Sequence, residues 1–187
     1  MYYESTRNRN IKKKFSEVLL TGLAEDGGLY VPKKWVKFSN KDFKKFERMT
    51  YYEMAFHISK RFIGNEIKDT ELKKIIKKSL KNFSKNDIAT LKNLSDNEWL
   101  LELYHGPTLA FKDYALQIVG NLFDYILKKR NKKITILGAT SGDTGSAAID
   151  GCKKKNTMEV FIFHPLKKIS NIQRRLMTTV KEKNIHK

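Results

Sequence analysis

Apolar residues recur at helical spacing in several stretches of the chain, and these stretches predict most of its helices. After residue 112 they repeat at i, i+3, i+4 and i+7 and end in a cluster of cations near residue 130, which suits the negative end of a helix dipole. Residues 50–83 predict two further helices separated at Gly64. Residues 15–23 predict a short helix with Ser16 as its N-cap.

Later segments combine β-rich and helical patterns. A strand, a glycine-rich turn, a helix and a second strand are expected over residues 133–137, 138–145, 146–154 and 160–163. This order predicts a βαβ unit with parallel strands. Upstream of it, residues 99–104 predict another strand, and the polar stretch between residues 84 and 98 predicts a linker or connecting loop.

These patterns predict an α/β chain with two domains. Residues 1–85 are expected to form a mainly helical N-terminal domain, and residues 95–187 are expected to form the first part of a domain with parallel strands.

The net charge of the chain raises the question of an anionic partner. Its 38 Lys and Arg residues against 20 Asp and Glu residues give a formal net charge of +18. The lysines occur in short clusters along the whole chain, which is typical of solvated faces and argues against a nucleic-acid partner. Neither the Cys/His spacing of zinc modules nor the aromatic signatures of single-strand RNA binding are present, so no metal site is expected.

Cysteine usage and hydropathy bear on where the chain resides. Cys152 is the single cysteine, so an intrachain disulfide is excluded and a reducing cytoplasm is the simpler compartment. No apolar run is long enough to suggest a membrane span. Residues 12–24 resemble a secretory signal peptide, because basic residues precede an apolar segment, but Glu17 interrupts that apolar segment. A cytoplasmic protein with no membrane partner is therefore expected.

Lys112 is a candidate nucleophile. It follows the apolar Phe111 and directly precedes a predicted helix, so it is expected at a strand-to-helix corner where its amine is partly desolvated. A partly desolvated lysine amine can form a Schiff base with an aldehyde cofactor. From the residues alone, a surface or capping lysine is an equal alternative.

The loop between residues 138 and 145 is a candidate anion site. It follows a predicted strand and opens a predicted helix, so its N–H groups are expected to face a ligand crevice, with Gly142 permitting close approach and Ser141 and Thr144 adding donors. An unliganded helix N-terminus is the alternative. Asp143 could accept from a cofactor or cap the helix. The loop lacks the Gly-Lys-Ser/Thr ending of a Walker A motif.

Five longer segments together resemble one enzyme family. They are residues 3–7, 15–32, 101–117, 138–145 and 164–173, which include Glu-Asp-Gly-Gly-Leu-Tyr-Val-Pro, His-Gly-Pro-Thr-Leu-Ala-Phe-Lys-Asp and Thr-Ser-Gly-Asp-Thr-Gly. In these segments the chain resembles threonine synthase. The resemblance implies an incomplete catalytic domain of fold type II, a three-layer αβα architecture that binds pyridoxal 5'-phosphate.

The resemblance also implies roles for single residues. Lys112, with Phe111 beside it, would be the Schiff-base lysine, and Asp143 would lie beside the cofactor. In the same loop, the substrate carboxylate would be received by Ser141, Gly142 and Thr144. Arg7 would be a phosphate partner, with a structural salt bridge as the equal alternative.

The activity implied by the resemblance is the conversion of O-phospho-L-homoserine and water to L-threonine and phosphate. Full-length members of the family are more than twice as long, and their phosphate-binding glycine loop has no counterpart here, since no glycine follows Gly151. We therefore expect an N-terminal fragment that is weak or inactive alone, whose partner is the missing C-terminal portion. A non-catalytic remnant and, behind it, a basic nucleic-acid-binding module are the alternatives.

Overall fold

The computed structural model describes residues 1–84 and 88–186, which fall into two compact units. The first is Met1–Lys77, and the second begins at Lys78. The division lies inside a helix, whereas the sequence placed it in the polar stretch that follows, and the domain ranges 1–85 and 95–187 stay predictions. Among the described residues, no helix combines the length and the apolar character needed to cross a bilayer.

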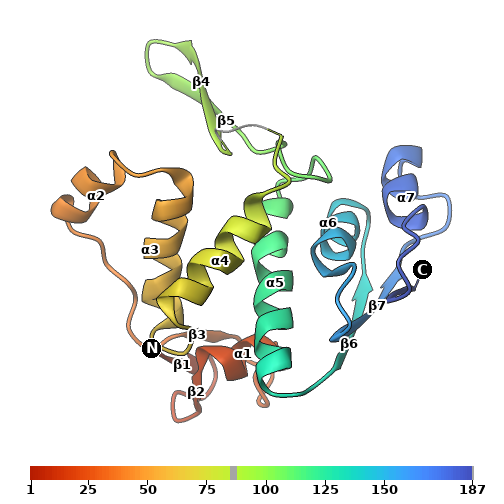
Figure 1. The fold of residues 1–187 in the computed structure, drawn as a ribbon, viewed down its shortest axis with the longest axis horizontal. Helices are drawn as coiled ribbons and strands as arrows, with labels where there is room; N and C mark the ends of the chain where they lie inside the picture. The colour runs from red at the N-terminus through yellow and green to blue at the C-terminus, as the bar shows by residue number, and fades with distance from the viewer. Residues whose placement is uncertain (85–87, 187) are drawn as a thin grey trace. The chain divides into compact units, whose positions relative to one another are not determined.

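The first unit combines helices with a small antiparallel sheet (Figure 1). Its strands, in the spatial order β2-β1-β3, are β1 (Tyr2–Ser5), β2 (Lys12–Lys14) and β3 (Tyr30–Pro32). Its helices are α1 (Phe15–Thr21), α2 (Asn40–Phe46), α3 (Tyr51–Ile63) and α4 (Asp69–Leu80), the last of which ends in the second unit. β1, β2 and α2 are short and were not predicted from the sequence.

The ends of these helices follow from local capping. The expectation that Ser16 caps α1 is wrong: Lys14 is the N-cap, and its N–H donates to the Glu17 carboxylate at 2.8 Å. Ser16 instead donates to the Glu66 carboxylate at 2.6 Å. The predicted break after α3 is confirmed, because Gly64 ends that helix with a φ of 70°, which favours glycine.

The second unit contains a β-hairpin and a parallel sheet. Its elements are β4 (Thr90–Ser95), β5 (Glu98–Glu102), α5 (Asp113–Lys129), β6 (Ile134–Ala139), α6 (Asp143–Cys152), β7 (Met158–Phe163), α7 (Asn171–Thr178) and β8 (Ile185–His186). β6 pairs in parallel with β7, and β7 with β8, which confirms the predicted parallel βαβ unit. The turn between β6 and α6 is shorter than predicted because both elements extend into it.

The polar stretch expected to be a linker is largely structured. β4 pairs antiparallel with β5, so most of this stretch is one arm and the turn of a hairpin, and residues 85–87 lie outside the described residues. The pattern did not predict β4 because almost all of its residues are exposed, and an exposed strand carries no alternation of buried and polar positions.

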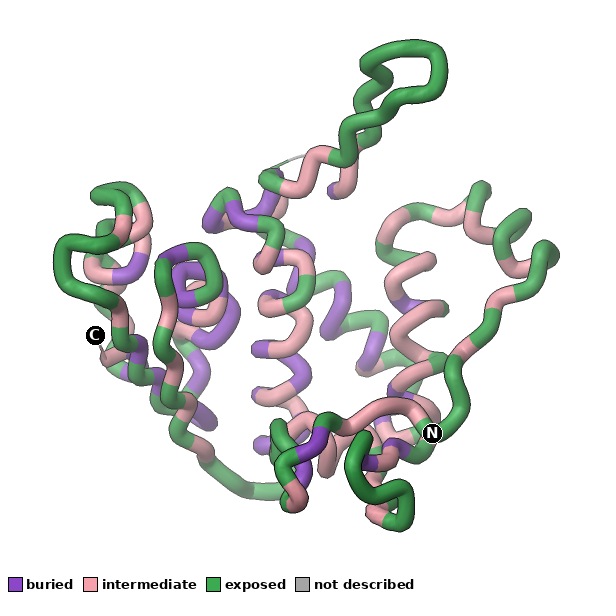
Figure 2. Tube along the Cα trace, turned by 180° about the vertical axis from the view of Figure 1, so that it is seen from behind, coloured by how far each residue is buried: buried purple, intermediate pink, exposed green. Residues whose placement is uncertain are grey.

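The parallel sheet has one buried and one exposed face. Along β7 the side chains of Met158, Val160 and Ile162 are buried, whereas Phe161 and Phe163 alternate with them and are exposed (Figure 2). The buried face is directed toward α6, where a Cβ on Gly145 would lie 3.2 Å from the Ile162 side chain. The three-layer arrangement is not completed by the described residues, because no helix of the unit covers the other face.

Two glycines allow α5 and α6 to approach closely. A Cβ on Gly120 of α5 would lie 2.3 Å from the Gly151 carbonyl oxygen, and a Cβ on Gly151 would lie 2.6 Å from the Leu116 carbonyl oxygen. Both contacts are to backbone, which cannot move aside without shifting a helix. The two helices therefore pack backbone against backbone at this point.

This close approach predicts the effect of one added methyl group. Gly120→Ala is expected to lower the free energy of unfolding by about 1–3 kcal/mol, because the new Cβ overpacks the contact with Gly151. Gly138→Ala is the control, since its Cβ would meet only the end of the Ile162 side chain at 3.0 Å. Urea unfolding measures both, and an unchanged stability of Gly120→Ala would show that the helices are not in this contact.

Candidate active site

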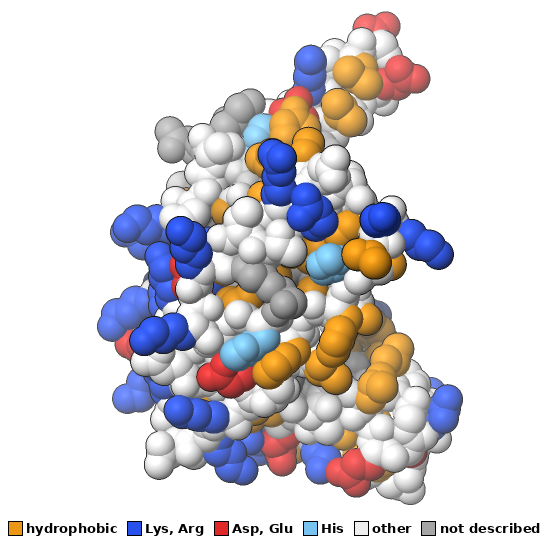
Figure 3. Space-filling view, turned by 90° about the vertical axis from the view of Figure 1, so that its right-hand side faces the viewer, with side chains coloured by type: hydrophobic (Ala, Val, Ile, Leu, Met, Phe, Trp, Pro, Cys, Tyr) orange, Lys and Arg blue, Asp and Glu red, His pale blue; other side chains and the backbone are white. Residues whose placement is uncertain are grey.

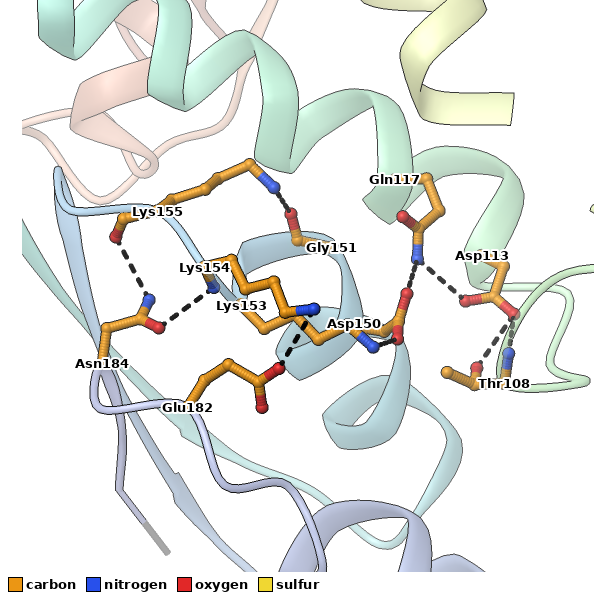
Figure 4. Close-up of polar contacts among 10 residues, drawn as sticks. All are labelled: Thr108, Asp113, Gln117, Asp150, Gly151, Lys153, Lys154, Lys155, Glu182 and Asn184. Carbon is orange, nitrogen blue, oxygen red and sulfur yellow. Dashed lines mark hydrogen bonds and ion pairs between the residues drawn. The ribbon is translucent and has the colours of Figure 1, made fainter. Parts of the chain in front are cut away.

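A buried carboxylate shapes the loop that leads into α5. Asp113 is 0% exposed, and its Oδ2 accepts hydrogen bonds from the Thr108 N–H at 2.8 Å and the Thr108 hydroxyl at 2.9 Å (Figure 4). Gly106 passes so close that a Cβ there would lie 2.5 Å from the Asp113 side chain. Leu109 adopts a φ of 60°, which is uncommon for a residue other than glycine. The loop is thus folded back onto the first turn of the helix.

The same carboxylate connects α5 to α6. The Gln117 side-chain amide donates to Asp113 Oδ1 at 3.5 Å and to Asp150 Oδ2 at 2.9 Å, and Asp150 also forms an ion pair with Lys153 (Figure 4). Burial raises the pKa of the Asp113 carboxyl, and the hydrogen bonds from Thr108 oppose this effect. The network ties the loop, α5 and α6 into one frame.

Lys112 lies at the end of this loop, immediately before α5. It is the N-cap of the helix, and its Nζ lies 4.2 Å from the centre of the Phe111 ring. Phe111 is 56% exposed and Lys112 is partly exposed, so the amine is accessible to solvent. Within the described part of the chain, no carboxylate forms an ion pair with this amine. Lys112 therefore combines a fixed backbone with a reachable amine.

His105, at the start of the same loop, is built into the structure. Its side chain is buried, and its Nε2 lies 3.2 Å from Glu102 Oε2. Its carbonyl oxygen accepts from the Ser84 N–H at 2.8 Å. These contacts are those of a histidine packed into a turn.

The turn between β6 and α6 is organised by a threonine hydroxyl. Thr140 Oγ1 accepts from the N–H groups of Gly142 and Gly145, each at 3.1 Å. Gly142 has a φ of 150°, and α6 begins at Asp143. The first N–H groups of a helix have no acceptor within it, and here they are at the carboxyl end of a parallel strand. Ser141 and Thr144 are exposed at this position.

Asp143 does not take one of the two roles considered for it from the sequence, that of capping the helix. Gly142 is the N-cap of α6, so the Asp143 carboxylate does not cap that helix. Instead, Asp143 Oδ1 accepts from the Gln173 side-chain amide of α7 at 2.7 Å. The same amide group covers Gly142, where a Cβ would lie 2.5 Å from Gln173 Cδ. Gln173 is thus a residue of this site that spacing alone did not single out.

An open pocket of about 390 Å³ lies where β6 and β7 end. It is lined by Ala139, Thr140, Ser141, Phe163, His164 and Pro165. Among the described residues, His164 Nδ1 is one of the few buried side-chain atoms without a hydrogen-bond partner. The Thr140 and Ser141 hydroxyls and the His164 ring are the polar side-chain groups of this lining, and Ala139, Phe163 and Pro165 make the rest of it apolar.

The structure brings most of the predicted site residues to one end of the second unit. The N-terminal ends of α5 and α6 face the same way, so Lys112 and the turn with Ser141, Gly142 and Asp143 share that end (Figure 1). Arg7 belongs to the first unit, where its Nη1 donates to the Asp26 carbonyl oxygen at 3.1 Å. This end therefore offers an amine and a set of anion donors.

Comparisons with known proteins agree with this arrangement. Residues 2–80 match the family model for the threonine synthase N terminus. A threonine synthase from Pseudomonas aeruginosa is 47% identical over 186 residues, which is 100% of this chain and 40% of the relative. One from Saccharomyces cerevisiae is 42% identical and covers 98% of the chain.

Solved structures also match this chain to threonine synthases. The crystal structure of a pyridoxal phosphate-bound threonine synthase from Brucella melitensis superposes with a TM-score of 0.95 at 38% identity, over 100% of this chain and 40% of that one. The yeast enzyme gives a TM-score of 0.92 at 41% identity, over 98% and 39%. The chain thus has the fold of the corresponding part of these threonine synthase structures. The chain corresponds to the N-terminal portion of threonine synthase and spans about 40% of the length of these relatives.

The buried Asp113 predicts a pH effect on stability. Since its pKa is raised in the folded state, its contribution to stability is full below the ordinary value of 3.8 and is lost as pH rises through the higher folded value. Asp113→Asn removes this loss. The stability of the variant relative to the unmodified chain is therefore expected to increase as pH rises above the ordinary pKa of 3.8. Urea unfolding at several pH values measures this difference, and parallel pH profiles would contradict it.

Proposed function

We propose that this chain is the N-terminal part of a pyridoxal phosphate-dependent threonine synthase, which converts O-phospho-L-homoserine and water to L-threonine and phosphate in the cytoplasm. The observation that carries the proposal is the fixed, accessible Lys112 at the same end of the unit as the turn before α6, in a chain that matches threonine synthases over its whole length. The fold is proposed to be the beginning of a fold type II catalytic domain.

The residues present fit one side of the cofactor. Lys112 supplies the amine that would hold the cofactor aldehyde, with the Phe111 ring beside it. Two residues at the pocket offer polar groups to a ligand. His164 Nδ1 lacks a hydrogen-bond partner, and the Ser141 hydroxyl is exposed and can bond to a ligand. We assign the cofactor phosphate no site among these residues. Pyridoxal phosphate, when bound, supplies an electron sink for negative charge that develops on substrate carbons.

The side chains of this chain have separate tasks in the proposed reaction. The turn of Ser141, Gly142 and Thr144 binds the substrate carboxylate through the Ser141 and Thr144 hydroxyls and through the N–H groups that do not already donate to Thr140. The Lys112 amine takes and returns protons at the substrate carbons, which is general acid–base catalysis by a positioned lysine. Asp143 lies beside the cofactor and, through Gln173, keeps α7 against the turn. Arg7 is proposed as a partner for the phosphate group of the substrate.

A fused protein tests the role of Lys112. The chain is joined to the part of the Pseudomonas aeruginosa threonine synthase that it does not match, and threonine formation from O-phospho-L-homoserine is measured. Lys112→Ala is expected to lower kcat on the order of 10³-fold, because both cofactor attachment and proton transfer are lost. Lys133→Ala, a lysine of the same unit outside this site, serves as the control. A fully active Lys112→Ala fusion would refute the assignment.

The chain by itself is expected to bind pyridoxal phosphate weakly or not at all. Borohydride reduction followed by peptide mapping measures this directly, since it reports how much cofactor is attached to Lys112 and how much to other lysines. Selective modification of Lys112 in the isolated chain would show that the described residues suffice for cofactor binding.

A further inference from the structure

We propose that Gln173 of α7 is a positioning residue for substrate binding, because it holds the Asp143 carboxylate away from the first N–H groups of α6. Those N–H groups then stay free for the carboxylate of the substrate. The identity of the substrate rests on the proposed function. The contact between α7 and the turn before α6 does not, because residues of this chain alone form it.

The Gln173 side chain is held at both ends of its amide group. Its Nε2 donates to Asp143 Oδ1 at 2.7 Å, and its Oε1 accepts from the Ser170 hydroxyl at 3.1 Å. Ser170 is also the N-cap of α7, where its oxygen accepts from the Gln173 N–H at 3.2 Å. A carboxylate only accepts hydrogen bonds, so the amide nitrogen is the atom that faces Asp143. The start of α7 therefore gives this amide a single defined orientation.

The same side chain covers the turn before α6. Gly142 is buried, although both of its neighbours in the chain are exposed. A Cβ on Gly142 would lie 2.5 Å from Gln173 Cδ and 2.6 Å from its Nε2. One turn further along α7, Met177 is 0% exposed, and its sulfur would lie 2.7 Å from a Cβ on Gly145. The helix α7 thus packs against the start of α6 at two points, and Gln173 is the polar one.

The Asp143 carboxylate is a potential competitor for the site that the turn offers to an anion. Asp143 is the first residue of α6, and its N–H group and that of Thr144 have no acceptor within the helix. A carboxylate binds such groups favourably, because the helix dipole places positive charge at this end. A released Asp143 side chain would therefore compete with the substrate for these donors. The hydrogen bond to Gln173 holds it aside.

The charge of the surroundings attracts anions without selecting among them. On the side of the molecule shown in Figure 3, which includes α7, Lys and Arg side chains are more abundant than those of Asp and Glu. The helix itself carries Arg174 and Arg175. This field attracts the Asp143 carboxylate as well as a substrate carboxylate. A directed hydrogen bond distinguishes the two, and Gln173 supplies it without adding charge to the site.

Kinetics of the fused protein test this role. Gln173→Met preserves the length of the side chain but removes its donor, so it is expected to raise the KM for O-phospho-L-homoserine roughly tenfold while kcat changes less than about threefold. Gln173→Glu is expected to raise KM further, because its charge repels both Asp143 and the substrate carboxylate. Ile172→Met, at a neighbouring position of α7 that is 72% exposed, is the control and is expected to leave both constants unchanged.

Two kinetic outcomes would overturn the proposal. An unchanged KM in both Gln173 variants would show that the side chain does not prepare the turn for the substrate. A lower kcat at an unchanged KM would place Gln173 in the chemical step and not in substrate binding.

Acetate binding to the chain alone gives a readout without cofactor or catalysis. Sodium acetate is titrated against sodium chloride at equal ionic strength, and the N–H signals of Asp143 and Thr144 are followed in a ¹H–¹⁵N correlation spectrum. The unmodified chain is expected to show saturable shifts, and Gln173→Met is expected to bind acetate about tenfold more weakly with the rest of its spectrum preserved.

The acetate titration separates this proposal from the proposed function. Absence of the shifts in the unmodified chain, or equal acetate affinity in Gln173→Met, would overturn the role of Gln173. An inactive unmodified fusion, combined with acetate binding that depends on Gln173, would refute the proposed function and support the role of this residue at the turn.

Discussion

The hydrogen bonds between the buried Asp113 carboxylate and Thr108 are the interaction on which the second unit depends. They fold the loop back onto the start of α5 and leave Lys112 at the corner, with its main chain fixed and its amine reachable. Gln117 extends the same network to Asp150 on α6. Because an unpaired buried carboxylate is costly, the loop cannot open without exposing Asp113 or leaving it unsatisfied.

The close packing of α5 on α6 fixes the relative positions of the residues in this network. Gly120 and Gly151 let the two backbones touch, so the helices can shift little relative to each other. The amine before one helix and the anion donors before the other are consequently held by a common rigid body. Among the described residues, helices cover the sheet only on the face that contacts α6. The site is therefore held by packed elements, whereas the opposite face of the sheet has no covering layer.

Much of this arrangement could be predicted from the sequence where apolar periodicity is strong. α3, α4 and α5 bury one side and show it in their spacing, and the parallel pairing of β6 with β7 followed from the order of the elements. β1, β2 and β4 are short or exposed, so they carry little periodic signal.

The candidate site was predictable in its residues but not in its contacts. Lys112 and the turn before α6 stood out by their neighbours and by the family resemblance, whereas the bond between Asp143 and Gln173 joins positions far apart along the chain. The His164 Nδ1 atom is buried without a hydrogen-bond partner because of how the folded chain packs around it. A local sequence pattern carries no information on such packing. The N-cap of α1 moved to Lys14 because Ser16 found a distant partner in Glu66.

The Thr140 hydroxyl has a further consequence for recognition at the turn. Because its oxygen already receives two backbone N–H groups, the turn loses its conformational freedom when the chain folds and not when a ligand arrives. The hydroxyl proton of Thr140 must then point away from both N–H donors and toward another acceptor, such as an oxygen atom of a ligand. A carboxylate would therefore meet a donor whose direction was set in advance, and the entropic cost of ordering the turn would be absent from its affinity.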